Sequence, residues 1–341
     1  MLNITWFILW GLLWALYFML DGFDLGLGAL MPLYAKNDTE KRMILNAMGP
    51  FWDGNEVWLI TAGGATFAAF PKTYAVMFST LYAPLLLILF ALILRGVAFE
   101  FRSKVESHSW RQIWEWCLII GSFAPALLFG VAFANIFKGI PFDAQGMFHG
   151  DIFTLLNPYG LAGGLFFLFF FFMHGAIWAS VKTKGMTAER AKGIAPKLWI
   201  ITLILAVLFL TYSGFATTLY NNYLSHPVLF VIPLIAVVAL LMVRVFMAKN
   251  NWWKAWFASA VTIVMVTYFG ITGMFPNLYP SSLDPAASLN IYNSASTQGT
   301  LKIMFVVVLI CVPFVLAYQI WHYIALRHPV TEEIIHDEDA Y

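Results

Sequence analysis

The sequence predicts an all-α, polytopic membrane protein, a single integral membrane domain that covers residues 1–341. Hydrophobic residues make up 61% of the chain and charged residues only 11%, and the mean hydropathy is +0.78. These values lie far outside the range of soluble domains. We therefore expect membrane lipid around the chain, and no nucleic-acid partner.

Nine apolar stretches are long enough to cross about 30 Å of hydrocarbon at about 1.5 Å per helical residue. The second stretch is the least regular, because it is short, contains Gly63-Gly64 and stops at Pro71. The nine predicted helices lie near residues 4–33, 51–70, 73–101, 112–137, 159–181, 198–220, 227–248, 254–275 and 301–325.

The basic residues orient the predicted helices. With nine helices, one set of alternate loops carries most of the lysines and arginines, whereas the other set carries only Lys72, Lys138 and Lys302. Loops rich in lysine and arginine stay in the cytoplasm. The sequence therefore predicts an N-terminus outside and a C-terminus in the cytoplasm.

Acidic residues in the first two predicted helices are the candidate functional groups. Asp21 and Asp24 fall in the cytoplasmic half of the first helix, and Asp53 and Glu56 fall near the cytoplasmic end of the second. A spacing of three residues places each pair on one helix face. Arg95, in the third helix, is expected at the same depth. A carboxylate at this depth costs several kcal/mol unless it is paired or protonated.

This arrangement has two interpretations. Four unpaired carboxylates would repel one another and some would hold protons at neutral pH, which is the condition for a proton relay. Alternatively, Arg95 neutralises one carboxylate and the others line a structural polar seam. Glu100 and Glu115 lie near helix ends, where side chains reach water, and for these two we favour the structural interpretation, with Glu100 in a supporting position.

Histidine content argues against haem ligation by this chain. Of its seven histidines, His174 alone lies deep in a predicted helix, and His322 lies near the end of the last one. Haem b in membranes usually takes two axial ligands from a helix bundle. We expect His174 to be a hydrogen-bonded packing residue, and the sequence predicts no metal site.

Small residues recur at helical spacing, as Gly22-x-x-x-Gly26 and as Gly160-x-x-x-Gly164. In membrane helices such spacing usually lets two backbones approach closely. We therefore assign these glycines to helix packing.

Several segments resemble subunit II of the cytochrome bd quinol oxidases. The similarity is carried by Asp21–Gly26, by Trp52–Gly64 and by Arg95–Lys104, and it continues at Met274–Pro276. It extends over almost the whole chain. The Trp52–Gly64 segment is long and unusual enough to make coincidence negligible.

The resemblance implies a respiratory complex that oxidises quinol and reduces dioxygen to water with protons from the cytoplasm. Two haems b and one haem d would be bound by a partner, subunit I. The resemblance places Asp53 with Trp52, and Asp24 with Asp21, in a proton path towards the oxygen-reduction site, and we add Glu56 to this relay. The location implied is the plasma membrane of a bacterium or archaeon.

Further features follow from the same resemblance. Arg95 and Glu100 match the basic-then-acidic pattern of the family, and we interpret Arg95 as a structural counter-ion. Some relatives hold a quinone in subunit II, and some add a small single-helix accessory subunit. The short segment Asn221–His226 weakens the case for an accessory subunit docked at that loop.

Two other functions remain open. A stand-alone proton-coupled transporter would also carry intramembrane carboxylates, but such folds often show inverted repeats. The sequence has no convincing internal repeat, and its acidic residues gather in the first four helices. A purely structural scaffold for subunit I differs from the relay only in how aspartate variants behave.

Overall fold

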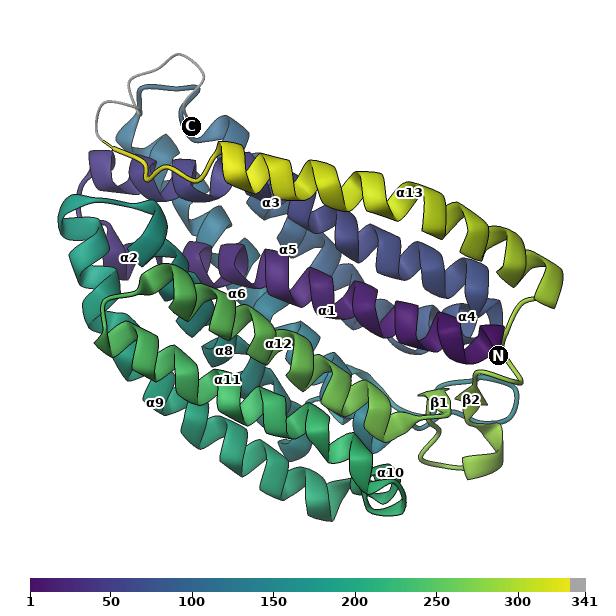
Figure 1. Ribbon diagram of the computed structural model, residues 1–341. Coiled ribbons are helices and arrows are strands. Elements are labelled where there is room, and N and C mark those ends of the chain that lie inside the picture. The colour runs from purple at the N-terminus through teal and green to yellow at the C-terminus, as the bar shows by residue number, and fades with distance from the viewer. Residues whose placement is uncertain (332–341) are drawn as a thin grey trace.

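The computed structural model describes residues 1–331, and its long helices run roughly side by side in one bundle (Figure 1). The last part of the predicted domain, residues 332–341, lies outside the described residues. The elements are α1 (Leu2–Ala29), α2 (Met31–Tyr34), α3 (Asp38–Ala69), α4 (Pro71–Thr80), α5 (Tyr82–Phe101), α6 (His108–Lys138), α7 (Ile152–Leu155), α8 (Pro158–Lys182), α9 (Gly185–Ala216), α10 (Tyr220–Ser225), the 3-10 helix η1 (Pro227–Phe230), α11 (Val231–Ala248), α12 (Trp252–Met274), β1 (Asn277–Tyr279), the 3-10 helix η2 (Pro285–Ala287), β2 (Leu289–Asn290) and α13 (Gln298–Ala325).

Within residues 1–331, eight helices are long and apolar enough to cross a membrane: α1, α5, α6, α8, α9, α11 together with η1, α12 and α13. The remaining predicted span corresponds to α3, whose 32 residues reach about 48 Å at 1.5 Å per residue. It is long enough to cross, but it carries more polar residues. The multi-pass, all-helical class is confirmed, whereas the count of nine and the orientation stay predictions.

Two predicted helices begin much earlier in the structure. α3 starts at Asp38, where the side chain of Asn37 accepts a hydrogen bond from the Glu40 backbone N–H at 2.8 Å. α9 starts at Gly185. Hydropathy marks only the part of a helix that hydrocarbon surrounds, whereas a cap marks where the helix begins. Both helices therefore extend beyond their apolar stretches.

Prolines interrupt two helices that the sequence predicts as continuous. The first predicted helix breaks at Leu30, before Pro32, and the third breaks at Leu81, before Pro84. Proline has no backbone N–H, and its ring collides with the carbonyl four residues earlier. The breaks therefore lie within the turn that precedes each proline.

Close packing at the centre of the bundle depends on glycine. α1 packs against α3, α6, α8 and α12. A Cβ on Gly26 would lie 1.8 Å from the Phe171 backbone oxygen, and one on Gly175 would lie 2.4 Å from the Leu27 nitrogen. Gly22 faces the Phe171 ring in the same way. The prediction that this glycine pattern serves helix packing is confirmed.

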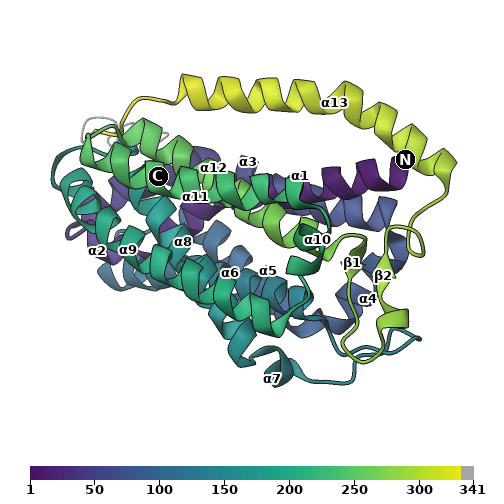
Figure 2. The same ribbon diagram turned by 60° about the horizontal axis from the view of Figure 1, so that its bottom comes forward.

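α13 runs along the outside of the bundle (Figure 2). Leu301 is its one buried residue. Near its start the Trp6 indole donates to the Leu301 oxygen at 3.0 Å. Beyond its end, Lys182 Nζ donates to the backbone oxygens of Leu326 and His328. The two ends of α13 are thus tied to the bundle, while most of its surface is open.

A short β-hairpin, absent from the all-helical prediction, lies between α12 and α13. β1 pairs with β2 in antiparallel fashion, and the hydroxyls of Tyr279 and Thr80 are 2.6 Å apart. Pro276, Pro280 and Pro285 surround β1. Residues before proline favour extended backbone, so helix cannot continue through this segment. The hairpin packs at the same end of the bundle as the N-terminus (Figure 1).

We predict that Gly26→Ala destabilises the protein by about 1–3 kcal/mol, because the added methyl overlaps backbone that cannot move freely. Thermal unfolding of the purified protein in detergent measures the loss. The control is Gly193→Ala in α9, where nothing lies within 4 Å of the added Cβ. It should be neutral or slightly stabilising, since alanine favours helix. Equal melting temperatures for the two variants would contradict the packing argument.

Candidate functional site

The acidic residues of α1 and α3 meet at one arginine of α5. Nη2 of Arg95 donates to Asp21 Oδ1 at 2.6 Å and to Glu56 Oε1 at 2.8 Å. The side chains of Arg95 and Asp21 are 1% and 0% exposed, whereas that of Glu56 is 21% exposed. These three groups, which the sequence predicts at one depth, are in direct contact. Glu56 is the member closest to the surface.

Asp24 lies in the same region but has a different partner. Its Oδ2 accepts a hydrogen bond from Asn55 Nδ2 at 2.7 Å, and the same nitrogen donates to the Leu20 oxygen at 3.1 Å. Asp24 is 1% exposed. Its second oxygen, Oδ1, has no hydrogen-bond partner among the described residues. We call Asp21, Asp24, Glu56 and Arg95 the acidic cluster.

The structure does not bring Asp53 into the acidic cluster. Asp53 is exposed on the outer face of α3, together with Gly54 and Val57, and it forms no hydrogen bond or ion pair with any residue of the described range 1–331. Trp52 is partly buried, and its ring stacks on Phe99 at a centroid distance of 5.3 Å. Both are therefore neighbours of the cluster on α3 and not direct contacts.

The two glutamates that we expected to be structural, Glu100 and Glu115, differ in their exposure and partners. Glu100 is exposed near the end of α5. Glu115 is only 7% exposed, and it accepts from Lys41 Nζ at 2.8 Å and from Arg102 Nη2 at 2.7 Å. The expectation that Glu115 reaches water is wrong. Two cations neutralise it, and Arg102 also bonds Asp38 at 2.6 Å. This network links α3, α5 and α6 at one end of the bundle.

His174 is fully buried in α8, as expected for a packing residue. Its Nδ1 is 2.6 Å from Ser259 Oγ, its Nε2 is 3.0 Å from the Met19 oxygen, and its ring stacks on Trp256. Both ring nitrogens are engaged, so neither is available to an iron atom. Within residues 1–331, no three His, Cys, Asp or Glu side chains gather as metal ligands. Among the described residues, His174 therefore does not fit the role of a haem ligand.

Asn55, Gln319 and Tyr323 are site residues that the sequence reasoning missed. Asn55 Oδ1 accepts from Tyr323 Oη at 2.9 Å and from Gln319 Nε2 at 3.3 Å. An asparagine inside a membrane helix is itself a signal, because its amide needs partners there. The partners lie on α13, far along the chain, and nothing in the sequence pairs them.

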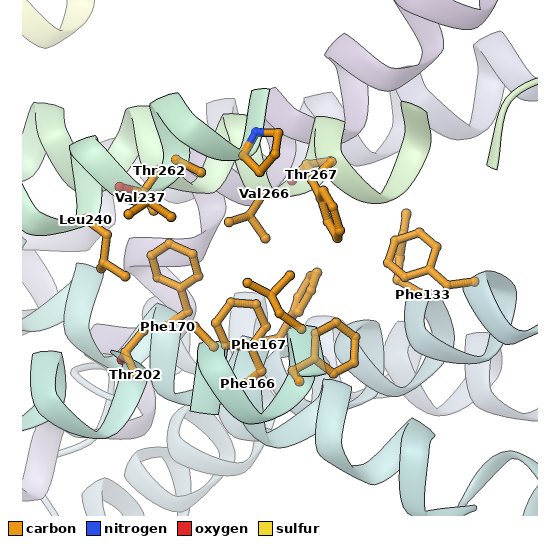
Figure 3. A pocket seen from close by; sticks show the side chains of 17 residues that line it. Phe133, Phe166, Phe167, Phe170, Thr202, Val237, Leu240, Thr262, Val266 and Thr267 are labelled. Atoms are coloured by element: carbon orange, nitrogen blue, oxygen red, sulfur yellow. The ribbon is translucent and has the colours of Figure 1, made fainter. Parts of the chain in front are cut away.

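Two apolar cavities lie apart from the acidic cluster. The first, of about 70 Å³, is lined by phenylalanines of α6, α8, α9 and α12 and closed by residues of α11 (Figure 3). The second, of about 550 Å³, lies among α1, α3, α4, α5 and α6, and Trp10, Trp14 and Tyr74 are among its lining residues. Neither cavity is lined by a carboxylate.

The fold and the site together define a class: a polytopic membrane protein with a carboxylate cluster buried around one arginine. The family model described as "Cytochrome bd terminal oxidase subunit II" matches residues 2–326. The chain belongs to this family.

Three similar proteins are also described as subunit 2 of a cytochrome oxidase. The chain is 38% identical over 352 residues to "Probable cytochrome oxidase subunit 2" of Haemophilus influenzae, with 94% of this chain and 93% of the relative covered. It is 35% identical over 367 residues to "Cytochrome bd-I ubiquinol oxidase subunit 2" of Escherichia coli strain K12, with 98% and 96% covered. It is 34% identical over 333 residues to "Cytochrome bd ubiquinol oxidase subunit 2" of Bacillus subtilis, with 97% and 98% covered.

The fold has a solved counterpart in "The structure of bd oxidase from Geobacillus thermodenitrificans". The TM-score is 0.79 at 16% identity, and 96% of this chain and 98% of that chain are covered. Family membership makes the chain a multi-pass subunit of a haem-containing oxidoreductase complex with a subunit I partner.

Arg95→Gln should destabilise the folded chain by about 3–5 kcal/mol, because it leaves the buried Asp21 and the partly exposed Glu56 without a cation. The double variant Arg95→Gln/Asp21→Asn should recover part of this loss, because it removes one of the uncompensated charges. Thermal unfolding of the purified complex measures both. Arg244→Gln, at an exposed arginine of α11, is the control and should change stability by less than about 0.5 kcal/mol.

Proposed function

We propose that this chain is subunit II of a quinol:oxygen oxidoreductase, that it stabilises subunit I, and that it supplies part of a cytoplasmic proton path to the oxygen-reduction site. The observation that carries the proposal is the acidic cluster. Its carboxyl groups outnumber its cations, and it lies among helices surrounded by apolar residues.

The charge balance of the cluster supports a relay. Asp21, Asp24 and Glu56 face one arginine, and three ionised carboxylates would leave two negative charges without a cation inside the bundle. Burial of an unpaired charge costs several kcal/mol, so a carboxyl group in such a site takes up a proton instead. A cluster that holds exchangeable protons at this depth can deliver them.

The geometry supports a direction for the relay. Glu56 is partly exposed, whereas Asp21 is fully buried, and both accept from the same arginine nitrogen. In the proposed path a proton enters at Asp53 and Glu56 and passes to Asp21 and Asp24. Two carboxyl oxygens on one nitrogen lie close enough for a single bridging water. Arg95 holds the two acids in place, and because its guanidinium stays protonated it does not take part in the proton transfer.

The exposed position of Asp53 supports an interface on α3. Lipid hydrocarbon cannot solvate a carboxylate, and Asp53 shares its face of α3 with apolar Val57 and Ile60. We propose that subunit I covers this face, so that the path crosses between the subunits there. Trp52, with Glu100 nearby on α5, would support this region.

The cofactors and partners follow from the proposed assignment. Two haems b and one haem d would be held by subunit I, which agrees with the engagement of both ring nitrogens of His174 in this chain. Quinol would be the electron donor, and lipid would surround the complex in the plasma membrane. A small single-helix accessory subunit, docked elsewhere than at residues 221–226, would be a further partner. The apolar cavity of about 550 Å³ supports a bound quinone in this chain.

Asp24→Asn and Asp53→Asn should each lower quinol-driven oxygen uptake by about a hundredfold, while haem content stays normal. Each variant keeps the shape of the side chain and removes proton transfer, which contributes about 10²–10⁴-fold in rate. Glu189→Gln, at a surface residue paired with Lys192, is the matched control and should retain full turnover. Wild-type rates in both aspartate variants would exclude the relay, and loss of haem would assign the aspartates a structural role.

Affinity purification of the chain from native membranes tests the complex itself. Co-purified haem with b- and d-type reduced-minus-oxidised spectra, together with quinol-driven oxygen uptake, is the expected result. A stable, haem-free single chain would contradict the assignment and favour a transporter.

A further inference from the structure

Two side chains near the end of α13 contact Asn55, which in turn donates to Asp24 of the acidic cluster. Gln319 and Tyr323 lie four residues apart, so they project from one face of α13. Both donate to the same atom, Asn55 Oδ1, at 3.3 and 2.9 Å. This contact joins α13 to the middle of α3, although most of α13 is open.

Every hydrogen-bonding position of the Asn55 side chain is occupied. A primary amide has two N–H donors and two acceptor positions on its oxygen. Nδ2 uses its donors on Asp24 Oδ2 and the Leu20 oxygen, and Oδ1 accepts from Gln319 and Tyr323. The Leu20 carbonyl can only accept, so it already requires the NH₂ group of Asn55 on the side of Asp24. The two α13 side chains occupy both acceptor positions of the amide oxygen and so hold the amide in place against Asp24.

Tyr323 is itself firmly placed. Its ring lies 4.8 Å from the Phe51 ring centroid and 6.0 Å from that of Trp178. The adjacent His322 bonds the Pro50 oxygen at 2.8 Å. The hydroxyl is thus held on Asn55 by rings of α3 and α8, independently of the hydrogen bond that it donates.

α13 is attached to the bundle by contacts other than the one with Asn55. The Trp6 bond to Leu301 and the Lys182 bonds beyond the end of the helix already tie α13 at both ends. Gln319 and Tyr323 donate to a buried amide, and this amide donates to a carboxyl group. Their contact is therefore better explained by positioning of the carboxyl group than by attachment of α13.

We propose that Tyr323 and Gln319 are positioning residues that act through Asn55 to fix the Asp24 carboxyl for proton transfer. The inference rests on the proposed function, in which Asp24 carries protons. It adds that the last helix sets the geometry of a buried acid on the first helix.

The test compares Tyr323→Phe and Tyr323→Phe/Gln319→Met with Tyr318→Phe in the assembled complex. Tyr318 is exposed on the same helix, and the control removes the same hydroxyl away from Asn55. Infrared difference spectra identify the Asp24 bands as those lost in Asp24→Asn. Oxygen uptake, the KM for quinol and haem content are measured on the same preparations.

The expected result is a shift of the Asp24 bands in Tyr323→Phe, larger in the double variant and absent in Tyr318→Phe. Turnover should fall by about two- to tenfold, the effect of one ordinary hydrogen bond, with haem content and the KM for quinol unchanged. A merely structural contact would not move the bands of a carboxyl group two hydrogen bonds away.

Two results would overturn the inference, and they are distinct from failure of the relay. Unchanged Asp24 bands in the double variant would show that α13 does not position this carboxyl. Normal turnover in the double variant, with Asp24→Asn inactive, would show that the positioning has no effect on the reaction. Normal turnover in Asp24→Asn would instead contradict the proposed function, whatever the bands of Tyr323→Phe show.

Discussion

The structure is organised around the guanidinium of Arg95, which shares one nitrogen between Asp21 and Glu56 inside the bundle. A buried charge without a partner is among the most costly features that a membrane helix can carry. α1, α3 and α5 must therefore keep a relative position that satisfies this arginine. The depth of the three groups and the exposure of Glu56 follow from this constraint.

Close helix packing at glycines holds the side chains of the acidic cluster in fixed positions. Gly26 and Gly175 let α1 and α8 approach until backbone meets backbone, and α1 contacts most of the long helices around it. Asp21 and Asp24 lie in the same segment of α1 as Gly22 and Gly26. The segment that packs most tightly is thus also the segment that carries the acids, so the carboxyl groups have little freedom to move.

The helices of the molecule differ in how much of their surface is exposed. α8 is largely buried, whereas α13 and one face of α3 are open, and that face of α3 carries Asp53. A membrane subunit that assembles with a partner needs such a surface, because an exposed carboxylate in lipid must find protein or water. The chain therefore has the kind of exposed surface that a subunit of a complex needs, and its buried acids lie next to the exposed face of α3.

The amino-acid sequence by itself determined the helical membrane class and the glycine contacts, and it predicted acidic residues at one depth with Arg95 as their counter-ion. The first two depend on composition or on spacing along one helix, which a sequence displays directly, whereas the last prediction depends on the order and direction of the predicted helices. It also carried the family resemblance, through segments such as Trp52–Gly64.

Only the tertiary structure decided which groups meet. Asn55, Gln319 and Tyr323 lie on helices separated by most of the chain, and no periodicity predicts a pairing between them. The outward position of Asp53 and the burial of Glu115 were decided in the same way. The physical reason is that hydropathy sets whether and at what depth a residue enters the membrane, whereas the rotation and packing of each helix set what the residue touches.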